Sequence, residues 1–566
     1  MATPAQAFPV TDSSPGLISC TKRPGLLNTG SVLLLVSLLI STLQLCWFGF
    51  RCAHQIDADG IDYTGIALEL KQGHFHESVN AFRSPLISWL MAAIPGLHPF
   101  QSGKLITIVS YMASIILVYF FTRRLWHSDT AAGFAALLVA VARGVAFDAI
   151  ALISPDFLLT DLVLIYFLIL LDCIRKDRRW FWLGCIHGLA YLAKAIALPW
   201  LAVATLTAAV SFGNTTEKLK RVATAALIPI LIATLWASVL HSKYGVFTTG
   251  SQFKTNLLQW TLREYRNHRP QTYSVLEDIS WSTDEHMVVD PMPPGSWTWR
   301  YKLDIRQLFP KIVEAEKTNL PRMLKSLIIL ANPGLLLGLL LLVGSRTRTT
   351  VLLSRQSRIL LFVVFVTATS LAFAYCMLVV DERYLLPLFP LLVAFGSRFM
   401  VGRGDLAPQS LRAFCWMLAV GALLWSLVYP SSPFRVQTRD FQVACYQAGA
   451  ALRRSPGTDV VSIGSGPYQE HGVGWEAGYK AAFFGEKRLI ATDESWARNQ
   501  LAPLLNDLQK AHASSILVWS GDNEARKELL NSLQSHYVVE SRITDPTLGD
   551  VGVVLVSRNL NIAGNR

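Results

Sequence analysis

The sequence predicts an all-α polytopic membrane bundle of about eleven transmembrane helices with a C-terminal soluble α/β domain. Hydrophobic residues make up 52% of the 566 residues and charged residues only 16%, whereas soluble domains carry about a quarter charged residues. Apolar runs long enough to cross a hydrocarbon core of about 30 Å recur as far as residue 429. From residue 430 onward, short apolar strands alternate with amphipathic helices.

The net charge of +12 indicates membrane topology and not nucleic-acid binding. Lys and Arg cluster in short loops between apolar runs, which is the pattern of basic residues retained on the cytoplasmic side of a membrane. No basic stripe follows a helix. We therefore expect the lipid bilayer as a partner and exclude nucleic acid.

The apolar runs divide the chain into three parts. Residues 1–25 are polar and predict a disordered cytoplasmic tail, residues 26–429 a membrane domain, and residues 430–566 an extracytoplasmic α/β domain. The first run lacks a small-x-small cleavage site and is too long for a signal peptide, so it is interpreted as an uncleaved span. Spans are expected near 31–50, 103–122, 131–147, 157–174, 222–240, 325–344, 357–380, 384–400 and 411–429.

The apolar stretch at 180–210 is too long for one crossing, and basic clusters precede and follow it. Two short helices that meet near Lys194 and Pro199 place both clusters in the cytoplasm, as the positive-inside rule requires. Pro199 supplies the helix break. This count places the N-terminus inside and the C-terminus outside, in a plasma or inner membrane.

Two loops, 51–102 and 241–324, are expected on the outer face with the C-terminal domain. In the first loop a helical stripe of apolar residues predicts that Asp62–Lys71 lies along the membrane surface. In the C-terminal domain the segments DVVSIGSG and SSILVWSG predict buried strands, and LAPLLNDLQKA and ARKELLNSLQS predict amphipathic helices.

Several charged residues lie at or within apolar runs, where a charge costs about 2.5–3.5 kcal/mol and usually has a partner or a function. Lys194 is the only charge in its stretch, Asp156 and Asp161 head the span at 157–174, and Arg383 precedes the span at 384–400. Plain structural roles remain open for each. Lys194 could extend to the interface, the carboxylates could stabilise a helix start, and Arg383 could pair with its acidic neighbours.

The first outer loop contains Asp59-x-x-x-Tyr63-x-x-x-Ala67, then Gly73, then Arg83-Ser84-Pro85-Leu86. This order resembles the first outer loop of the GT-C-type membrane glycosyltransferases, which include protein O-mannosyltransferases and lipid A aminoarabinose transferases. The resemblance implies that Asp59 is the catalytic base and that Arg83 contacts a carrier phosphate. Because Gly60 and Ser84 depart from the family pattern, Asp57 remains an alternative base. By spacing alone, Asp59 is a helix N-cap.

Three later segments extend the resemblance over residues 30–400. LLTDLVLIYFLILL points to Asp161, with Asp156 as its rival, and GLAYLAKAIAL points to Lys194. DERYLLPLFPLL points to Arg383 and Tyr384. The resemblance implies inverting transfer of a sugar from a polyprenyl-phosphate-linked donor to an acceptor protein, lipid or glycan.

The chemistry of glycosyl transfer fits these residue types. A carboxylate must take the proton of the acceptor hydroxyl, which is the role expected for Asp59 or Asp57, with Asp161 or Asp156 as an orienting carboxylate. Cations stabilise the charge on the departing phosphate. The substrate-binding set is expected to comprise Tyr63, Arg83, Lys194, Arg383 and Tyr384.

No metal cofactor is required by this scheme, although a divalent metal is possible. Asp57-Ala58-Asp59 forms a DxD triplet, and His54, His74 and His76 share its loop. A different class of function is a polyprenyl-lipid or sugar transporter or flippase, which favours inverted repeats and charges at mid-depth. A third is a scaffold in which Asp59 and Arg83 tolerate change. The absence of an internal repeat favours the enzyme.

Overall fold

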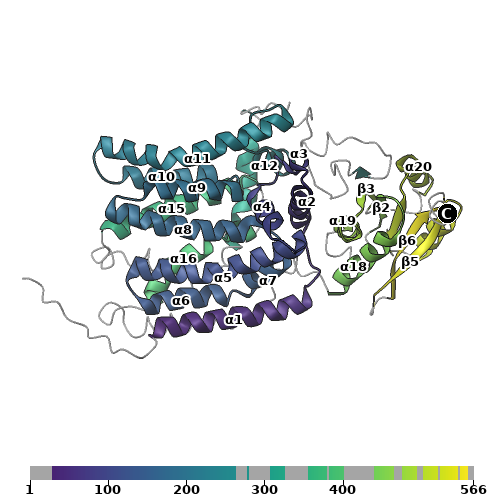
Figure 1. The fold of residues 1–566 in the computed structure, drawn as a ribbon, viewed down its shortest axis with the longest axis horizontal. Coiled ribbons are helices and arrows are strands. Elements are labelled where there is room, and N and C mark those ends of the chain that lie inside the picture. The colour runs from purple at the N-terminus through teal and green to yellow at the C-terminus, as the bar shows by residue number, and fades with distance from the viewer. Residues whose placement is uncertain are drawn as a thin grey trace, which may run out of the picture.

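The fold is a helical bundle with a mixed α/β unit against one end of it (Figure 1). The computed structural model describes residues 28–262, 277–278, 306, 308–325, 355–378, 382–400, 439–464, 474–493, 501–519, 523–545 and 549–558. The predicted tail at 1–25, the span at 411–429 and all but the first residue of the span at 325–344 lie outside these residues.

Long apolar helices make the chain a multi-pass membrane protein. Among the described residues, five helices are long and apolar enough to cross a membrane, and the bent pair α6 (Asp129–Ala140) and α7 (Arg143–Ala151) makes a sixth candidate with a 57° bend. These elements confirm the spans predicted over the same segments. The five are α1 (Thr29–Arg51), α5 (Pro99–Trp126), α8 (Pro155–Lys176), α11 (Thr215–Tyr244) and α15 (Arg355–Cys376).

The stretch at 180–210 folds as two helices, α9 (Trp180–Ala193) and α10 (Ala197–Val210), as predicted. The chain breaks at Lys194, the C-cap of α9, and not at Pro199. Pro199 lies in the first turn of α10, where a missing N–H leaves no helical hydrogen bond unmade. The turn between the two helices therefore brings Lys194 to the end of the bundle that faces the α/β unit (Figure 1).

The first loop folds into α2 (Ala58–Gln72), α3 (Phe75–Ser78) and α4 (Leu86–Ala93). The helix predicted over Asp62–Lys71 forms as part of α2, and its burial extends beyond the single apolar stripe seen in the sequence. Ile61, Tyr63, Ile66 and Ala67 are all buried, and Figure 1 shows α2 between the bundle and the α/β unit. Two packing surfaces bury α2 almost all round, which a single apolar stripe does not indicate.

Short elements complete the described membrane part. The helix α12 (Gln252–Asn256) continues into a π-helical turn, η1 (Leu257–Thr261). The predicted span at 384–400 opens with a 3₁₀ turn, η3 (Glu382–Leu385), before α16 (Phe389–Met400). The turn η3 places Arg383 at the same end of the bundle as α2.

The α/β unit contains a six-stranded mixed sheet with strand order β1-β3-β2-β4-β6-β5. β2 (Asp459–Ile463) runs parallel to β3 (Arg488–Asp493) and to β4 (Ser515–Trp519), and the remaining pairs are antiparallel. The predicted strands and helices are confirmed. The other elements are β5 (Tyr537–Asp545), β6 (Gly549–Ser557), α18 (Arg439–Arg454), α19 (Gly474–Gly485), α20 (Leu501–Ala511) and α21 (Asn523–Leu533).

One strand of this sheet comes from elsewhere in the chain. β1 (Glu277–Asp278) belongs to the loop at 241–324 and pairs with β3, with Glu277 opposite Thr492. An apolar cluster also joins Ile61 and Ile153 of the membrane part to Phe441 of α18. The α/β unit is therefore held to the bundle by both a shared sheet and a shared core.

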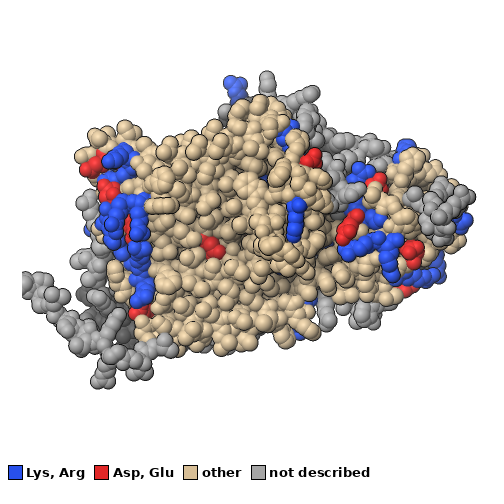
Figure 2. Space-filling model, viewed as in Figure 1, with Lys and Arg blue, Asp and Glu red and all other residues tan. Residues whose placement is uncertain are grey.

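Charge separates the two ends of the bundle. Basic residues end α5 and α8 and open α11, and they gather at the end away from the α/β unit. Figure 2 shows these Lys and Arg side chains at the left, a broad surface with few charges in the middle, and further charges at the right. The apolar zone between the charged ends is the part of the surface suited to the hydrocarbon core.

Candidate active site

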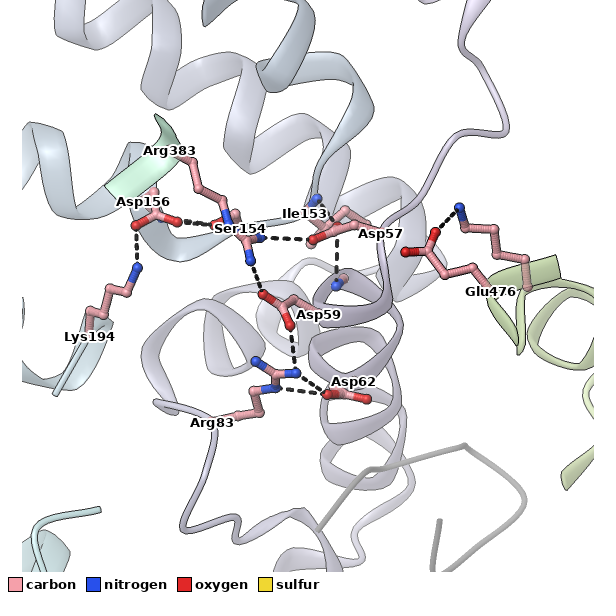
Figure 3. A network of polar contacts seen from close by, with 12 residues as sticks. Asp57, Asp59, Asp62, Arg83, Ile153, Ser154, Asp156, Lys194, Arg383 and Glu476 are labelled. Carbon is pink, nitrogen blue, oxygen red and sulfur yellow. Dashed lines mark hydrogen bonds and ion pairs between the residues drawn. The ribbon is translucent and has the colours of Figure 1, made fainter. Parts of the chain in front are cut away.

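Charged side chains from separate segments meet where α2, η3 and the turn between α9 and α10 approach one another (Figure 3). Their network includes Asp59, Arg83, Asp156, Lys194 and Arg383, which the sequence singled out. Asp57, which the sequence analysis named as the alternative base, and Asp62 belong to it as well.

Asp59 lies between two guanidinium groups. Its Oδ1 is 2.7 Å from Nη2 of Arg83 and its Oδ2 accepts a hydrogen bond of 2.5 Å from Nη2 of Arg383. Burial alone would raise the pKa of Asp59, but the charges of Arg83 and Arg383 hold it well below its ordinary value. The carboxylate is therefore ionised, while 26% of its side chain stays accessible.

Asp57, and not Asp59, is the N-cap of α2, so the N-cap interpretation of Asp59 is wrong. Asp57 Oδ1 accepts from the backbone N–H groups of Gly60 (3.2 Å) and Ile153 (3.3 Å), and Oδ2 accepts from Nη1 of Arg383 (3.1 Å). Burial raises the pKa of Asp57, and the charge of Arg383 opposes that shift. These contacts tie the start of α2 to the segment between α7 and α8.

Asp62 is the main partner of Arg83. Its Oδ2 accepts from Nε (2.8 Å) and Nη2 (2.5 Å) of Arg83, and its Oδ1 accepts from the hydroxyl of Tyr479 (2.7 Å). Burial raises the pKa of Asp62 to about 6, against the lowering effect of Arg83. Sequence analysis missed both Asp62 as a partner of Arg83 and Tyr479, because 417 residues separate Tyr479 from Asp62 and no motif links them.

Arg83 is positioned by the turn that precedes α4. The side chain of Asn80 accepts from the backbone N–H groups of Phe82 and Arg83, both at 2.8 Å, as in an Asx turn. The guanidinium also lies 5.6 Å from the centre of the Tyr63 ring, which is how the predicted residue Tyr63 enters the site. The local sequence thus fixes the backbone of Arg83 before its carboxylate partners fix the head group.

Lys194 and Asp156 form a buried ion pair. Lys194 Nζ donates to Asp156 Oδ1 at 2.5 Å, and Ser154 Oγ donates to Asp156 Oδ2 at 2.6 Å. Nζ also lies 4.3 Å from the ring centre of Tyr384, which stacks on Tyr375. Lys194 therefore points into the bundle and does not extend to the interface, so that interpretation of Lys194 is wrong.

Asp161 lies outside the network. Its Oδ1 accepts from Ser114 Oγ at 2.7 Å, and it follows Asp156 by five residues on α8, a rise of about 7 Å further into the bundle. Of the two carboxylates at the head of α8, only Asp156 reaches the cations. Arg383 contacts Asp57 and Asp59, while the side chains of the acidic neighbours with which it was also expected to pair lie outside the described residues.

A pocket opens beside Arg83. It lies among α4, α9 and α11, and Ser84 Oγ in its wall accepts from the backbone N–H of Ala195 at 3.1 Å. Aromatic and small residues form most of the lining: Ala81, Phe82, Arg83, Ser84, Pro85, Tyr191, Ala195, Trp236, Thr249, Gly250 and Gln252.

The candidate metal ligands do not converge. His54 stacks on Tyr446, His74 pairs with Glu69 at 2.8 Å, and His76 is exposed. Both carboxylates of the DxD triplet bind Arg383. Within the described part of the chain, no three His, Cys, Asp or Glu residues are grouped so that they could hold a metal ion.

The fold is similar to that of the GT-C membrane glycosyltransferases. Residues 82–240 match the family model described as dolichyl-phosphate-mannose-protein mannosyltransferase, a segment that includes Arg83, Asp156 and Lys194. The matched segment is about a quarter of the chain, and the match agrees with the resemblance that the loop motif indicated. No curated protein shows significant similarity to the sequence.

Solved structures share the fold at low sequence identity. ArnT from Cupriavidus metallidurans bound to undecaprenyl phosphate is 13% identical, with 93% of this chain and 97% of that chain covered and a TM-score of 0.50. The apo oligosaccharyltransferase from Archaeoglobus fulgidus is 10% identical, with 90% and 72% covered and a TM-score of 0.50. The fold is thus common to enzymes with different names, and the activity has to be argued from the site.

Proposed function

We propose that the protein transfers a sugar from a polyprenyl-phosphate-linked donor to an acceptor protein, lipid or glycan in one inverting displacement. The observation that supports this most directly is the placement of Asp59 between Arg83 and Arg383, at the membrane end that bears the α/β unit. A carboxylate beside several cations suits a reaction in which a hydroxyl loses a proton and a phosphate departs.

The site would face away from the cytoplasm. Basic residues gather at the opposite end of the bundle, and such residues are retained on the cytoplasmic side. In this orientation residues 26–429 form the membrane transferase domain and residues 430–566 the extracytoplasmic domain, to which the loop at 241–324 adds β1.

In the proposed step, the Asp59 carboxylate takes the proton of the acceptor hydroxyl as its oxygen attacks the anomeric carbon of the sugar. The bond from that carbon to the carrier phosphate oxygen breaks, and its electron pair leaves with the polyprenyl phosphate. Attack from the face opposite the phosphate inverts the anomeric configuration.

The carrier phosphate would bind the same cations that pair with carboxylates in this structure. Arg83 and Arg383 would donate to its oxygens as planar forks, and Lys194 would add a point charge beside Tyr384. A bound phosphate draws these cations from Asp59 and adds a negative charge nearby, and both changes raise the pKa of Asp59. Donor binding would thereby convert a weakly basic carboxylate into an effective base.

The other carboxylates have supporting roles in this scheme. Asp156 orients Lys194, and Asp57 fixes the start of α2 through its backbone contacts. Asp59 is preferred to Asp57 as the base because its contacts within the described part of the chain are with arginine side chains, whereas Asp57 also accepts from two backbone N–H groups. The protein cations supply the positive charge that the step requires, so we propose that transfer continues in a metal chelator.

The test is incubation of the purified protein in lipid nanodiscs with a panel of polyprenyl-phosphate sugars and acceptors, followed by mass spectrometry of the products. We expect a glycosylated acceptor and free polyprenyl phosphate in equal amounts. Movement of intact sugar-lipid across a vesicle membrane, without either product, would contradict the proposal and favour the flippase.

A further inference from the structure

We propose that Tyr479 of the α/β unit is a positioning residue of the transfer site. Tyr479 holds Asp62 in place, so that the guanidinium of Arg83 contacts both Asp62 and Asp59. This inference rests on the proposed function. It assigns to the α/β unit a part in the reaction, because the transfer site is complete only when α19 is seated against α2.

Arg83 is shared between two carboxylates through a single nitrogen. Its Nη2 lies 2.7 Å from Asp59 Oδ1 and 2.5 Å from Asp62 Oδ2, while its Nε donates to Asp62 alone at 2.8 Å. The guanidinium is a rigid plane, so the position of Asp62 Oδ2 sets the angle at which Nη2 meets Asp59. Any movement of Asp62 therefore changes how Arg83 contacts Asp59, the proposed base.

Tyr479 fixes the second oxygen of Asp62. The hydroxyl donates to Asp62 Oδ1 at 2.7 Å, and both side chains are almost completely buried. A hydrogen bond to an ionised carboxylate is roughly twice as strong as a neutral one. The position of Asp62 is thus set from both sides, by Arg83 of the membrane part and by Tyr479 of the α/β unit.

The surroundings of Tyr479 keep its ring in place. On the same helix, Lys480 donates to Glu476 at 2.9 Å, in an ion pair whose Lys480 side chain is only 3% exposed. The apolar cluster that joins the two parts of the chain also includes the ring of Tyr479. A rigid, packed phenol is well suited to present one hydroxyl at a fixed point.

Loss of this hydroxyl has a definite electrostatic consequence. The charged groups that face Asp62 are Arg83 and Asp59, with Tyr479 as the neutral donor. Burial already raises the pKa of Asp62, and without the donor it rises further. Protonated Asp62 no longer pairs with the charge of Arg83. Arg83 then pairs with Asp59 alone, which lowers the pKa of Asp59 and makes it a weaker base.

The first test compares Tyr479→Phe with Tyr446→Phe. Tyr446 stacks on His54 in the same interface at 4.2 Å and serves as the matched control. For Tyr479→Phe we expect kcat to fall about tenfold at neutral pH, the effect of one charge-assisted hydrogen bond. We also expect the acidic limb of the pH–rate profile to move to higher pH, with Tyr446→Phe close to wild type. An unchanged profile in Tyr479→Phe would overturn the proposal.

A double-mutant cycle with Asp62→Asn separates positioning from general damage. In the Asp62→Asn background, Tyr479→Phe should cost little further activity, because the residue that it positions no longer carries the charge. The same four proteins are compared by thermal unfolding in detergent, a readout that needs no substrate. Additive effects of the two substitutions on Tm would overturn the proposal whatever the activity shows. Transfer by Asp59→Asn at the wild-type rate is a different outcome, which would refute the proposed function.

Discussion

Arg383 reaches from η3 to Asp59 across 324 residues of sequence, with Nη2 2.5 Å from Oδ2, and its Nη1 binds Asp57 at 3.1 Å. One guanidinium thus joins the late part of the membrane domain to the first outer loop. The planar fork presents a separate nitrogen to each carboxylate, whereas a lysine has a single nitrogen for both. This relationship makes the site sensitive to the shape of the cation as well as to its charge.

Arg383→Lys should therefore lower the rate of transfer by about tenfold or more although the charge is kept. Lys can satisfy only part of the bonding that Arg383 offers to Asp57, Asp59 and a phosphate. Arg123→Lys is the matched control, because Arg123 pairs with Asp129 at the basic end of the bundle. Steady-state kinetics with varied donor would check this, and equal rates for the two variants would count against a role for Arg383.

The buried ion pair of Lys194 and Asp156 predicts that stability lost by one substitution can be restored by a second one without restoring activity. Lys194→Met leaves Asp156 buried without its counter-charge and should destabilise the fold by about 3–5 kcal/mol. Adding Asp156→Asn should restore much of that stability, because no uncompensated charge remains, but it should not restore transfer. Unfolding measured in detergent beside the activity assay tests both halves, and a double variant with normal transfer would contradict the role of Lys194.

Asp156 and Asp161 are distinguished by a direct comparison. We expect Asp161→Asn to retain most transfer activity, because its described partners are the hydroxyls of Ser114 and Ser110 and it lies about 7 Å deeper along α8 than Asp156. Asp156→Asn should lower activity strongly by releasing Lys194. If the order of the two effects were reversed, the orienting carboxylate would have to be reassigned to Asp161.

The raised pKa of Asp62 predicts how stability changes with pH. Folding raises this pKa from 3.8 to about 6, so the folded state binds the proton more tightly than the unfolded state. The stabilisation from that proton is complete below the unfolded pKa and is lost as pH rises to about 6. The Tm of Asp62→Asn should therefore gain on wild type between about pH 4 and pH 6, then level off. A flat difference over this interval would contradict the assignment.

The membrane spans that the structure describes were predictable because each crossing requires an apolar run of its own. The break at Lys194 followed from the basic clusters on either side of an overlong stretch, and Arg383 stood out as a charge next to a span. Asp59 and Arg83 were found through the loop motif that resembles a known family. Whether these candidate residues carry out the reaction remains a prediction.

Contacts between the two parts of the chain were not predictable. Nothing in local periodicity links Asp62 to Tyr479, and the short strand β1 carries no strand signal before its partner β3 is known. The N-cap was misplaced because Asp57 and Asp59 are the same residue type two positions apart, and only the contacts of Asp57 with Gly60 and Ile153 settle which one caps α2. Long-range packing, and not local propensity, decides such cases.

The central claim is that Asp59 accepts the proton of the acceptor hydroxyl. It is tested most directly by single-turnover transfer with Asp59→Asn beside Asp129→Asn, whose carboxylate is similarly exposed and also paired with an arginine, but at the far end of the bundle. We predict that Asp59→Asn lowers the rate about 100-fold or more in a protein that is still folded at the assay temperature, and that Asp129→Asn matches wild type. Transfer by Asp59→Asn at a rate close to that of Asp129→Asn would contradict the account.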